Sequence, residues 1–191
     1  MKRIVIFASG SGTNAENISR FFKQSSLASV VHILTNNKNA KVIGRSKKLN
    51  INSLVFSKDE FNDEVKVLKF LKKEADLIVL AGFLWKIPAH IIEAFPNKII
   101  NIHPALLPKY GGKGMYGMNV HKAVVANKEK ETGITIHYVN EHYDEGAIIF
   151  QAKTPVLPSD FAQDVADKIH ILEQKHFSKV IEDLIKSNID G

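Results

Sequence analysis

The chain has 191 residues, of which 45% are hydrophobic and 24% charged, and its 26 Lys and Arg exceed its 20 Asp and Glu to give a net charge of +6. This length and composition predict one ordinary folded domain and exclude a disordered or collagen-like chain. Because the chain contains no cysteine, disulfides, thiolate metal sites and cysteine nucleophiles are excluded as well.

The first hundred residues alternate between short apolar runs and segments with helical periodicity. The predicted order is strand 4–7, helix 14–23, strand 30–34, helix 41–49, strand 53–56, helix 59–73, strand 76–81, helix 88–95 and a strand from residue 99. Strands that are apolar throughout and separated by helices are typical of a parallel sheet covered on both faces.

The pattern changes after residue 103. A Gly-rich loop at 110–117 leads into a predicted helix at 120–126, and two strand-like runs at 134–139 and 147–156 precede a long helix at 162–186. In the first run apolar and polar residues alternate, which predicts a strand covered on one face only. The sequence therefore predicts an α/β fold: a single domain, doubly wound, with a mostly parallel sheet and antiparallel strands at its C-terminal end.

The first turn, Ser9 to Asn14, joins a strand to a helix. This arrangement leaves backbone N–H groups free at a helix N-terminus, where they favour phosphate. The run Gly10-x-Gly12-x-x-Ala15 also fits the loose dinucleotide fingerprint, but the next strand ends in Thr35-Asn36-Asn37 without the acidic residue that a ribose needs. Phosphate binding is favoured, while a dinucleotide site and a purely structural turn stay open.

A polar cluster follows the strand that begins at residue 99. Asn101 and His103 alternate there, so both point to one side of the carboxyl edge of the sheet, where they could hold and protonate an oxygen that gains negative charge. Asp144 is interpreted either as a turn residue or as a carboxylate that pairs with His103 and raises its pKa. Glu173 falls on the apolar stripe of the last helix, which favours a carboxylate aimed into a cleft.

The other histidines and the charge pattern give weaker signals. His32 and His137 lie in predicted strands and His90, His170 and His176 in predicted helices, and we interpret all five as structural. The basic residues are spread along the chain, which favours a solvated face and small phosphate sites over nucleic acid. The first apolar run is too short for a signal peptide, and no run reaches membrane-spanning length. We expect a cytoplasmic protein without nucleic-acid or membrane partners.

Several runs together carry a family resemblance. They are Gly10-Ser11-Gly12-Thr13-Asn14, Leu80-Ala81-Gly82-Phe83, Asn101-Ile102-His103-Pro104-Ala105-Leu106-Leu107-Pro108, Gly133-Ile134-Thr135-Ile136-His137 and Asp144-Glu145-Gly146-Ala147-Ile148-Ile149. In this order, along nearly the whole chain, they resemble the phosphoribosylglycinamide formyltransferases, a branch of the folate-dependent formyltransferase superfamily with a Rossmann-like fold.

The resemblance implies transfer of the formyl group from 10-formyltetrahydrofolate to the amine of 5-phosphoribosylglycinamide in purine synthesis, without a metal, by a monomer or homodimer. It implies one domain over 1–191, with a ribonucleotide-binding half at 1–100 and a catalytic and folate-binding half at 101–191. The implied catalytic residues are Asn101, His103 and Asp144, and the implied substrate residues are Gly12, Thr13 and Asn14 for phosphate and Glu173 for ribose. The implied folate residues are Lys58, Leu84, Trp85, Lys86, Ile87, Asn101, Asn140, Glu141, His142 and Tyr143.

The sequence departs from the family pattern at two places. The loop at 111–118 is longer than expected, and Leu84-Trp85-Lys86-Ile87 replaces a more aliphatic stretch. Three alternatives stay in view. A methionyl-tRNA formyltransferase is expected to carry an appended C-terminal domain, and a formyltetrahydrofolate deformylase an N-terminal regulatory one. A nucleotide-binding module without catalysis would leave Asn101, His103, Asp144 and Glu173 unexplained.

Overall fold

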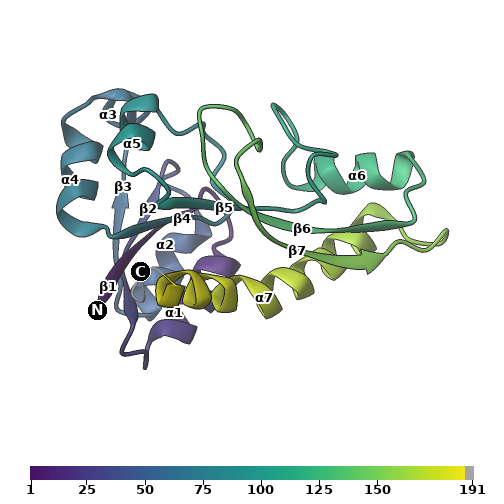
Figure 1. Cartoon of the computed structure of the whole chain (residues 1–191), viewed down its shortest axis with the longest axis horizontal. Helices are drawn as coiled ribbons and strands as arrows, with labels where there is room; N and C mark the ends of the chain where they lie inside the picture. Colours follow the sequence, from purple (N-terminus) through teal and green to yellow (C-terminus); the bar gives the residue numbers. More distant parts are fainter. Residues whose placement is uncertain (188–191) are drawn as a thin grey trace.

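The N-terminal part of the chain forms a parallel sheet in this computed structural model, which describes residues 1–187. Its strands are β1 (Lys2–Phe7), β2 (Ala28–Thr35), β3 (Asn52–Val55), β4 (Leu77–Leu80) and β5 (Ile99–His103). The helices between them are α1 (Thr13–Phe22), α2 (Lys41–Lys48), α3 (Lys58–Asn62), α4 (Lys66–Glu74) and α5 (Ala89–Ala94). Figure 1 shows these elements in purple to teal at one end of the molecule.

Two hydrophobic layers enclose the sheet because successive side chains of a strand point to opposite faces. Ile4 and Ile6 of β1 pack in one core with buried residues of α1, α2 and α7 (Ala162–Ser187). Val5 and Phe7 pack in a second core with buried residues of α3, α4 and α5. The apolar strands β1 and β4 are therefore buried on both sides, as the sequence predicts, whereas every residue of the edge strand β3 is exposed.

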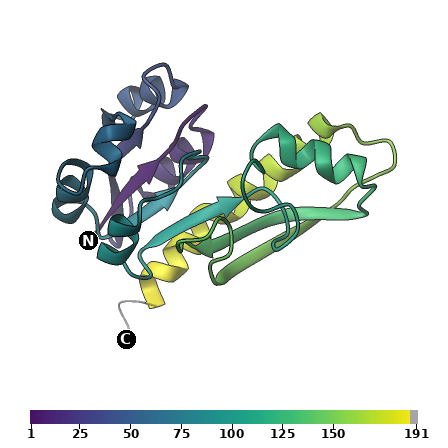
Figure 2. The ribbon, with the colours of Figure 1, turned by 90° about the horizontal axis from the view of Figure 1, so that it is seen from above.

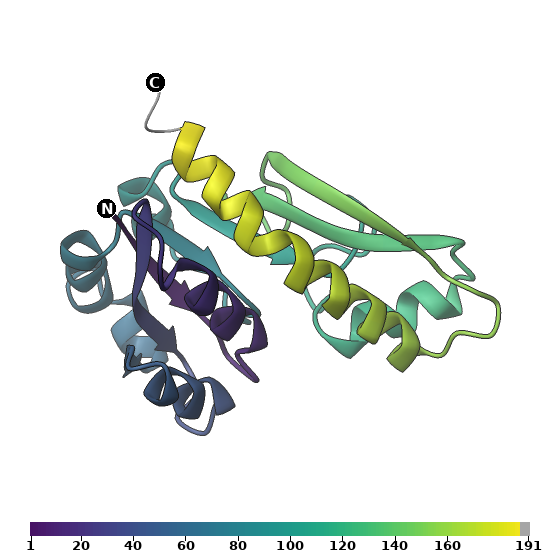
Figure 3. The ribbon, with the colours of Figure 1, turned by 90° about the horizontal axis from the view of Figure 1, so that it is seen from below.

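The C-terminal part adds an antiparallel extension. After α6 (Met118–Ala126), β6 (Glu131–Tyr138) pairs antiparallel with β5 and β7 (Ile148–Pro155) pairs antiparallel with β6, so the seven strands follow the order β3-β2-β1-β4-β5-β6-β7. The β6–β7 hairpin extends away from the parallel strands (Figure 2). The 26-residue helix α7 runs along α1, α6 and the hairpin, which joins both parts (Figure 3).

Two predictions about single elements are wrong. The helix expected at 59–73 is two helices, because Asp63 ends α3 and its carboxylate Oδ1 accepts the Val65 N–H at 2.7 Å, which turns the chain before α4. The strand expected to be half-covered is buried on both faces, with Thr135 and His137 at 0% and 2% exposure. The segment after β5 covers its polar face: Thr135 Oγ1 donates to the Ala105 carbonyl at 2.7 Å and accepts the Leu107 N–H at 3.0 Å.

Candidate active site

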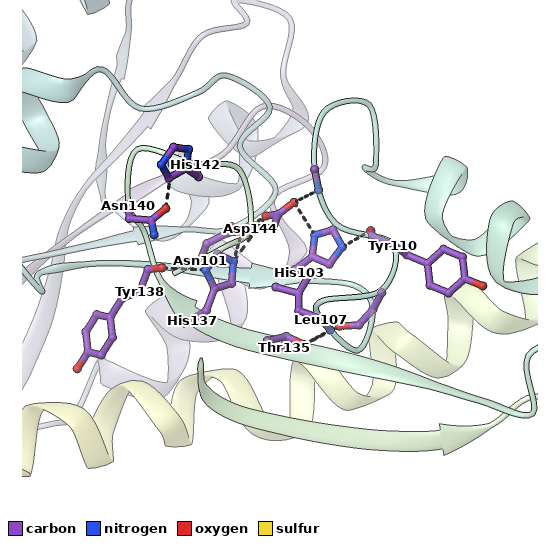
Figure 4. Close-up of polar contacts among 12 residues, drawn as sticks. Asn101, His103, Leu107, Tyr110, Thr135, His137, Tyr138, Asn140, His142 and Asp144 are labelled. Atoms are coloured by element: carbon purple, nitrogen blue, oxygen red, sulfur yellow. Dashed lines mark hydrogen bonds and ion pairs between the residues drawn. The ribbon is translucent and has the colours of Figure 1, made fainter. Parts of the chain in front are cut away.

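Three polar side chains meet where β5 ends. Asn101 and His103 project to the same side of β5, and the loop 139–147 between β6 and β7 carries Asp144 over them (Figure 4). Asn101 Nδ2 lies 3.5 Å from Asp144 Oδ1, and His103 Nδ1 lies 3.5 Å from Asp144 Oδ2. The structure thus brings together the three residues that the sequence singled out for catalysis.

Backbone groups of the Gly-rich loop fix this trio. His103 Nε2 lies 2.7 Å from the Tyr110 carbonyl oxygen. Because a carbonyl can only accept, Nε2 carries a hydrogen, and Nδ1 is left facing Asp144. The Gly112 N–H donates to Asp144 Oδ2 at 2.9 Å. The loop therefore orients both ionisable members of the trio.

His137 is a fourth member that the sequence interpretation assigned to scaffold. Its Nδ1 lies 2.8 Å from the Tyr138 carbonyl, so Nδ1 carries the hydrogen and Nε2 can accept from Asn101 Nδ2 at 3.1 Å. This bond fixes the Asn101 amide with its nitrogen toward Asp144. The contact follows from the antiparallel register, in which Asn101 of β5 is paired with His137 of β6, and sequence spacing does not reveal that register.

The ionisation of the trio differs in one respect from the expectation. Burial lowers the pKa of His103 below its ordinary value, although the Asp144 carboxylate and the Tyr110 carbonyl act to raise it. The predicted rise is therefore wrong, because the ring is only 3% exposed and desolvation prevails. Burial would raise the pKa of Asp144, yet His137, His103 and the Gly112 N–H lower it on balance. At neutral pH the site holds an ionised Asp144 beside a neutral His103.

The trio lies in the wall of a cleft of about 480 Å³, here called the central cleft. The first turn, the end of β5, the loop 112–117 and one face of α7 form its walls. Gly12, Thr13, Asn14 and Glu173, predicted to bind the ribonucleotide, all line it. His170, which the sequence interpretation took as structural, and His121 line it too.

Asn14 and Glu173 are held rigidly at one end of the central cleft. Asn14 Nδ2 donates to Glu173 Oε2 at 2.9 Å, and Asn14 Oδ1 accepts from Gln174 Nε2 at 2.8 Å. Burial raises the pKa of Glu173, against the lowering effect of Asn14 and of His170, whose Nδ1 lies 3.7 Å away. Because Glu173 also lines the central cleft, this desolvated carboxylate suits a ligand that donates hydrogen bonds.

Gly12 has a packing role in addition to its place in the wall of the central cleft. It is the N-cap of α1 with φ of 74°, a left-handed conformation that favours glycine. A Cβ built there would lie 2.9 Å from the Val42 Cα at the start of α2 and closer still to the Val42 side chain. The absence of a side chain at Gly12 thus lets α2 approach the turn, a reason that the sequence motif alone does not give.

Most of the predicted folate residues surround a second cavity of about 380 Å³, here called the side cavity. The predicted residues that line it are Lys58, Leu84, Trp85, Lys86, Ile87, Glu141 and Tyr143. Phe61, Asn62, Pro88, Ala89 and Ile92 line it as well. Leu84 and Tyr143 also line the central cleft, so the cavities adjoin. Asn101 lines the central cleft only.

Asn140 and His142 are not brought to the side cavity. Asn140 Oδ1 accepts the His142 N–H at 2.9 Å, an Asx turn that shapes the loop ahead of Asp144 (Figure 4). Trp85 packs its ring with Phe56, Phe61 and Phe83, so it is both cavity wall and part of an aromatic cluster.

His121 of α6 is a cleft residue that the sequence analysis did not single out. It is 6% exposed, and its Nδ1 has no hydrogen-bond partner among the described residues. Burial and the nearby His103 lower its pKa. Within residues 1–187 no group of three or more His, Asp or Glu side chains is arranged to hold a metal ion.

Comparison with known proteins identifies the family. The model of the formyl transferase family matches residues 2–181. This chain belongs to the formyl transferase family. The phosphoribosylglycinamide formyltransferase of Bacillus subtilis is 34% identical, covering 100% of this chain and 98% of its own length. The chloroplastic one of Vigna unguiculata is 39% identical over 98% of this chain, which spans only 62% of that longer protein.

Solved structures agree with this assignment. The glycinamide ribonucleotide transformylase 1 of Geobacillus kaustophilus matches with a TM-score of 0.87 and 34% identity, covering 97% of this chain and 99% of that one. The phosphoribosylglycinamide formyltransferase of Bacillus halodurans matches with a TM-score of 0.87 and 33% identity, covering 96% of this chain and 95% of that one. These matches confirm the family, its phosphoribosylglycinamide formyltransferase branch and the fold class predicted from the sequence.

Proposed function

We propose that this chain transfers the formyl group of 10-formyltetrahydrofolate to the amine of 5-phosphoribosylglycinamide, giving formylglycinamide ribonucleotide and tetrahydrofolate in purine biosynthesis. The observation that carries the proposal is the position of Asn101, His103 and Asp144 together in the wall of the central cleft, which adjoins the side cavity at Leu84 and Tyr143. Relatives that span nearly the whole chain are named for this activity, and formyl transferases of this family imply a folate donor.

The ribonucleotide occupies the end of the central cleft near α1. Its phosphate meets the N–H groups of Gly12, Thr13 and Asn14, where the N-terminus of α1 adds a favourable dipole. Glu173 accepts hydrogen bonds from the ribose hydroxyls. The existing Asn14–Glu173 bond at 2.9 Å holds both groups before the substrate arrives.

The folate occupies the side cavity and reaches the trio past Leu84 and Tyr143, which line both cavities. Its aromatic part packs against the apolar wall that includes Trp85 and Ile87. The exposed ammonium groups of Lys58 and Lys86 lie at this cavity and attract the carboxylates of the glutamate tail.

The reaction needs an oxyanion donor and a proton carrier. As the amine attacks the formyl carbon, the N–H of Asn101 Nδ2, which lies 3.5 Å from Asp144 Oδ1, donates instead to the oxygen that becomes negative, while the bond to His137 holds the amide. A donor of this kind is worth about 3 kcal/mol, or roughly 100-fold in rate. Neutral His103 takes the amine proton at Nδ1, and the ionised Asp144 stabilises the resulting imidazolium. When the bond from the formyl carbon to folate N10 breaks, His103 returns that proton to N10.

The remaining expectations are part of the proposal. Residues 1–191 act as one domain, because residues from both halves of the chain line both cavities. The enzyme acts as a monomer or a homodimer. The transfer needs no metal, since acid–base groups suffice for the steps above. Within the described residues no helix combines the length and apolarity required to span a bilayer. We propose the cytoplasm as its compartment, although two plant relatives are named chloroplastic.

An omission assay tests the function. Purified protein is incubated with 10-formyltetrahydrofolate and 5-phosphoribosylglycinamide, with each omitted in turn and with a chelator in a parallel series. We expect tetrahydrofolate to form only when both substrates are present, with or without the chelator. Release of formate without an amine acceptor would instead identify a deformylase, and transfer to methionyl-tRNA alone would identify the tRNA enzyme.

A further inference from the structure

Tyr110 connects the catalytic histidine to a distant turn. Its carbonyl oxygen lies 2.7 Å from His103 Nε2, while its phenol points away from the trio (Figure 4). The phenol hydroxyl donates to Glu129 Oε1 at 2.9 Å and accepts from Asn127 Nδ2 at 3.0 Å. Asn127 and Glu129 lie in the turn between α6 and β6, outside both cavities assigned to the substrates.

The backbone at Tyr110 adopts a conformation that its residue type disfavours. Its φ is 58°, in the left-handed region, where a glycine such as the neighbouring Gly111 or Gly112 would cost less energy than a tyrosine. A bulky residue stays there only when its surroundings hold it. The two bonds to the phenol, together with packing against the main hydrophobic core, supply that hold.

We propose that Tyr110 is a positioning residue that sets the tautomer and the orientation of His103, and that Glu129 and Asn127 anchor it from behind. The inference rests on the proton-carrying role proposed for His103. A carbonyl fixed beside Nε2 keeps the hydrogen on that nitrogen and leaves Nδ1 open toward Asp144 and the central cleft. If the carbonyl moved away, either nitrogen of the neutral ring could carry the hydrogen, and the ring could rotate.

The chain offers variants that separate the anchor from its neighbours. Tyr110→Phe removes only the hydroxyl, and Glu129→Ala removes its acceptor. We expect each to lower kcat about 10-fold, because small misplacements of a reacting group are costly, while KM for both substrates stays within about 2-fold. Glu129→Gln keeps an acceptor oxygen and should retain nearly full kcat. The double variant should be no slower than Tyr110→Phe, because Tyr110→Phe already lacks the hydroxyl that bonds to Glu129.

Lys109→Gln is the matched control. Lys109 Nζ also binds Glu129 Oε1, at 3.0 Å, but contacts neither His103 nor the Tyr110 hydroxyl. Its removal should leave kcat unchanged. A loss in Lys109→Gln equal to that in Glu129→Ala would overturn the proposal, because the surface ion pair and not the hydroxyl would then be responsible.

A second readout is independent of activity. The ¹⁵N shifts and couplings of the His103 ring, recorded by NMR without ligands, report which nitrogen carries the hydrogen. We expect the Nε2–H form alone in the wild type and a mixture of tautomers in Tyr110→Phe. An unchanged Nε2–H form in Tyr110→Phe would overturn the proposal even if the transferase activity is established. Conversely, a shifted tautomer with no formyl transfer by the wild type would support the positioning and refute the proposed function.

Discussion

The two ends of the active-site region differ in how completely they are built before ligands bind. At the end proposed for the ribonucleotide, Asn14 is 9% exposed and is bonded to Glu173 and Gln174 at 2.9 and 2.8 Å. At the end proposed for the folate, Leu84 and Tyr143 are 49% and 42% exposed. The contact across that end is the Lys86 ammonium 5.9 Å above the Tyr143 ring.

The difference shows that the central cleft and the side cavity suit ligands of different kinds. Polar groups that already hold one another in a desolvated site lose little entropy on binding, which favours a small, charged ligand in one orientation. Exposed apolar side chains and exposed lysines suit a larger ligand with an aromatic body and a charged tail. The trio shares the central cleft with Asn14 and Glu173, and Leu84 and Tyr143 join that cleft to the side cavity.

The largest expected effect comes from the trio itself. We predict that Asp144→Asn and His103→Ala each lower kcat by at least about 100-fold while both proteins stay folded, because one variant cannot stabilise the imidazolium and the other lacks the proton carrier. Steady-state kinetics together with circular dichroism measure this. Turnover near that of the wild type in either folded variant would remove the mechanism.

The next prediction tests the packing role of Gly12. Gly12→Ala should lower the free energy of unfolding by about 2–4 kcal/mol, because the residue has a positive φ and its Cβ would press on Val42. Gly10→Ala is the control, since nothing lies within 4 Å of a Cβ at Gly10. Denaturant unfolding of both variants gives the comparison. Equal stability of the two would show that the turn tolerates a side chain.

A smaller effect is expected from pH. Burial lowers the pKa of His103, so below its unfolded pKa of about 6.5 the unfolded chain binds a proton that the folded chain does not. Stability therefore falls as pH drops below that value. When the pH falls from 7.5 to 5.5, the free energy of unfolding of His103→Asn should decrease by up to about 1.4 kcal/mol less than that of the wild type. NMR titration that placed the His103 pKa above 6.5 would contradict the assignment of a neutral ring.

Local sequence pattern predicted part of the structure. The buried strands β1 and β4, the first turn and the alternation of Asn101 with His103 are properties of neighbouring residues and lie where they were expected. Local pattern failed for the helix expected at 59–73, which is broken into α3 and α4, and for the strand expected to be half-covered, because the cover over β6 comes from the segment after β5. His137 was missed because its bond to Asn101 depends on the β5–β6 register. His121 was missed because a lone histidine on a helix carries no signal until α6 is placed against the cleft. The pKa of His103 was misjudged because burial depends on the loop that covers it.

The central claim, that the two ends bind two different substrates, is tested most directly by a crossed calorimetric titration. Each protein is titrated with 5-phosphoribosylglycinamide and, separately, with tetrahydrofolate. Glu173→Gln should weaken the ribonucleotide roughly 10- to 150-fold, since a bond to a charged group contributes about 1.5–3 kcal/mol, and leave the folate unchanged. Lys58→Gln combined with Lys86→Gln should weaken the folate by about 5- to 20-fold and leave the ribonucleotide unchanged. The reverse pattern, or equal losses for both ligands in both proteins, would contradict the account.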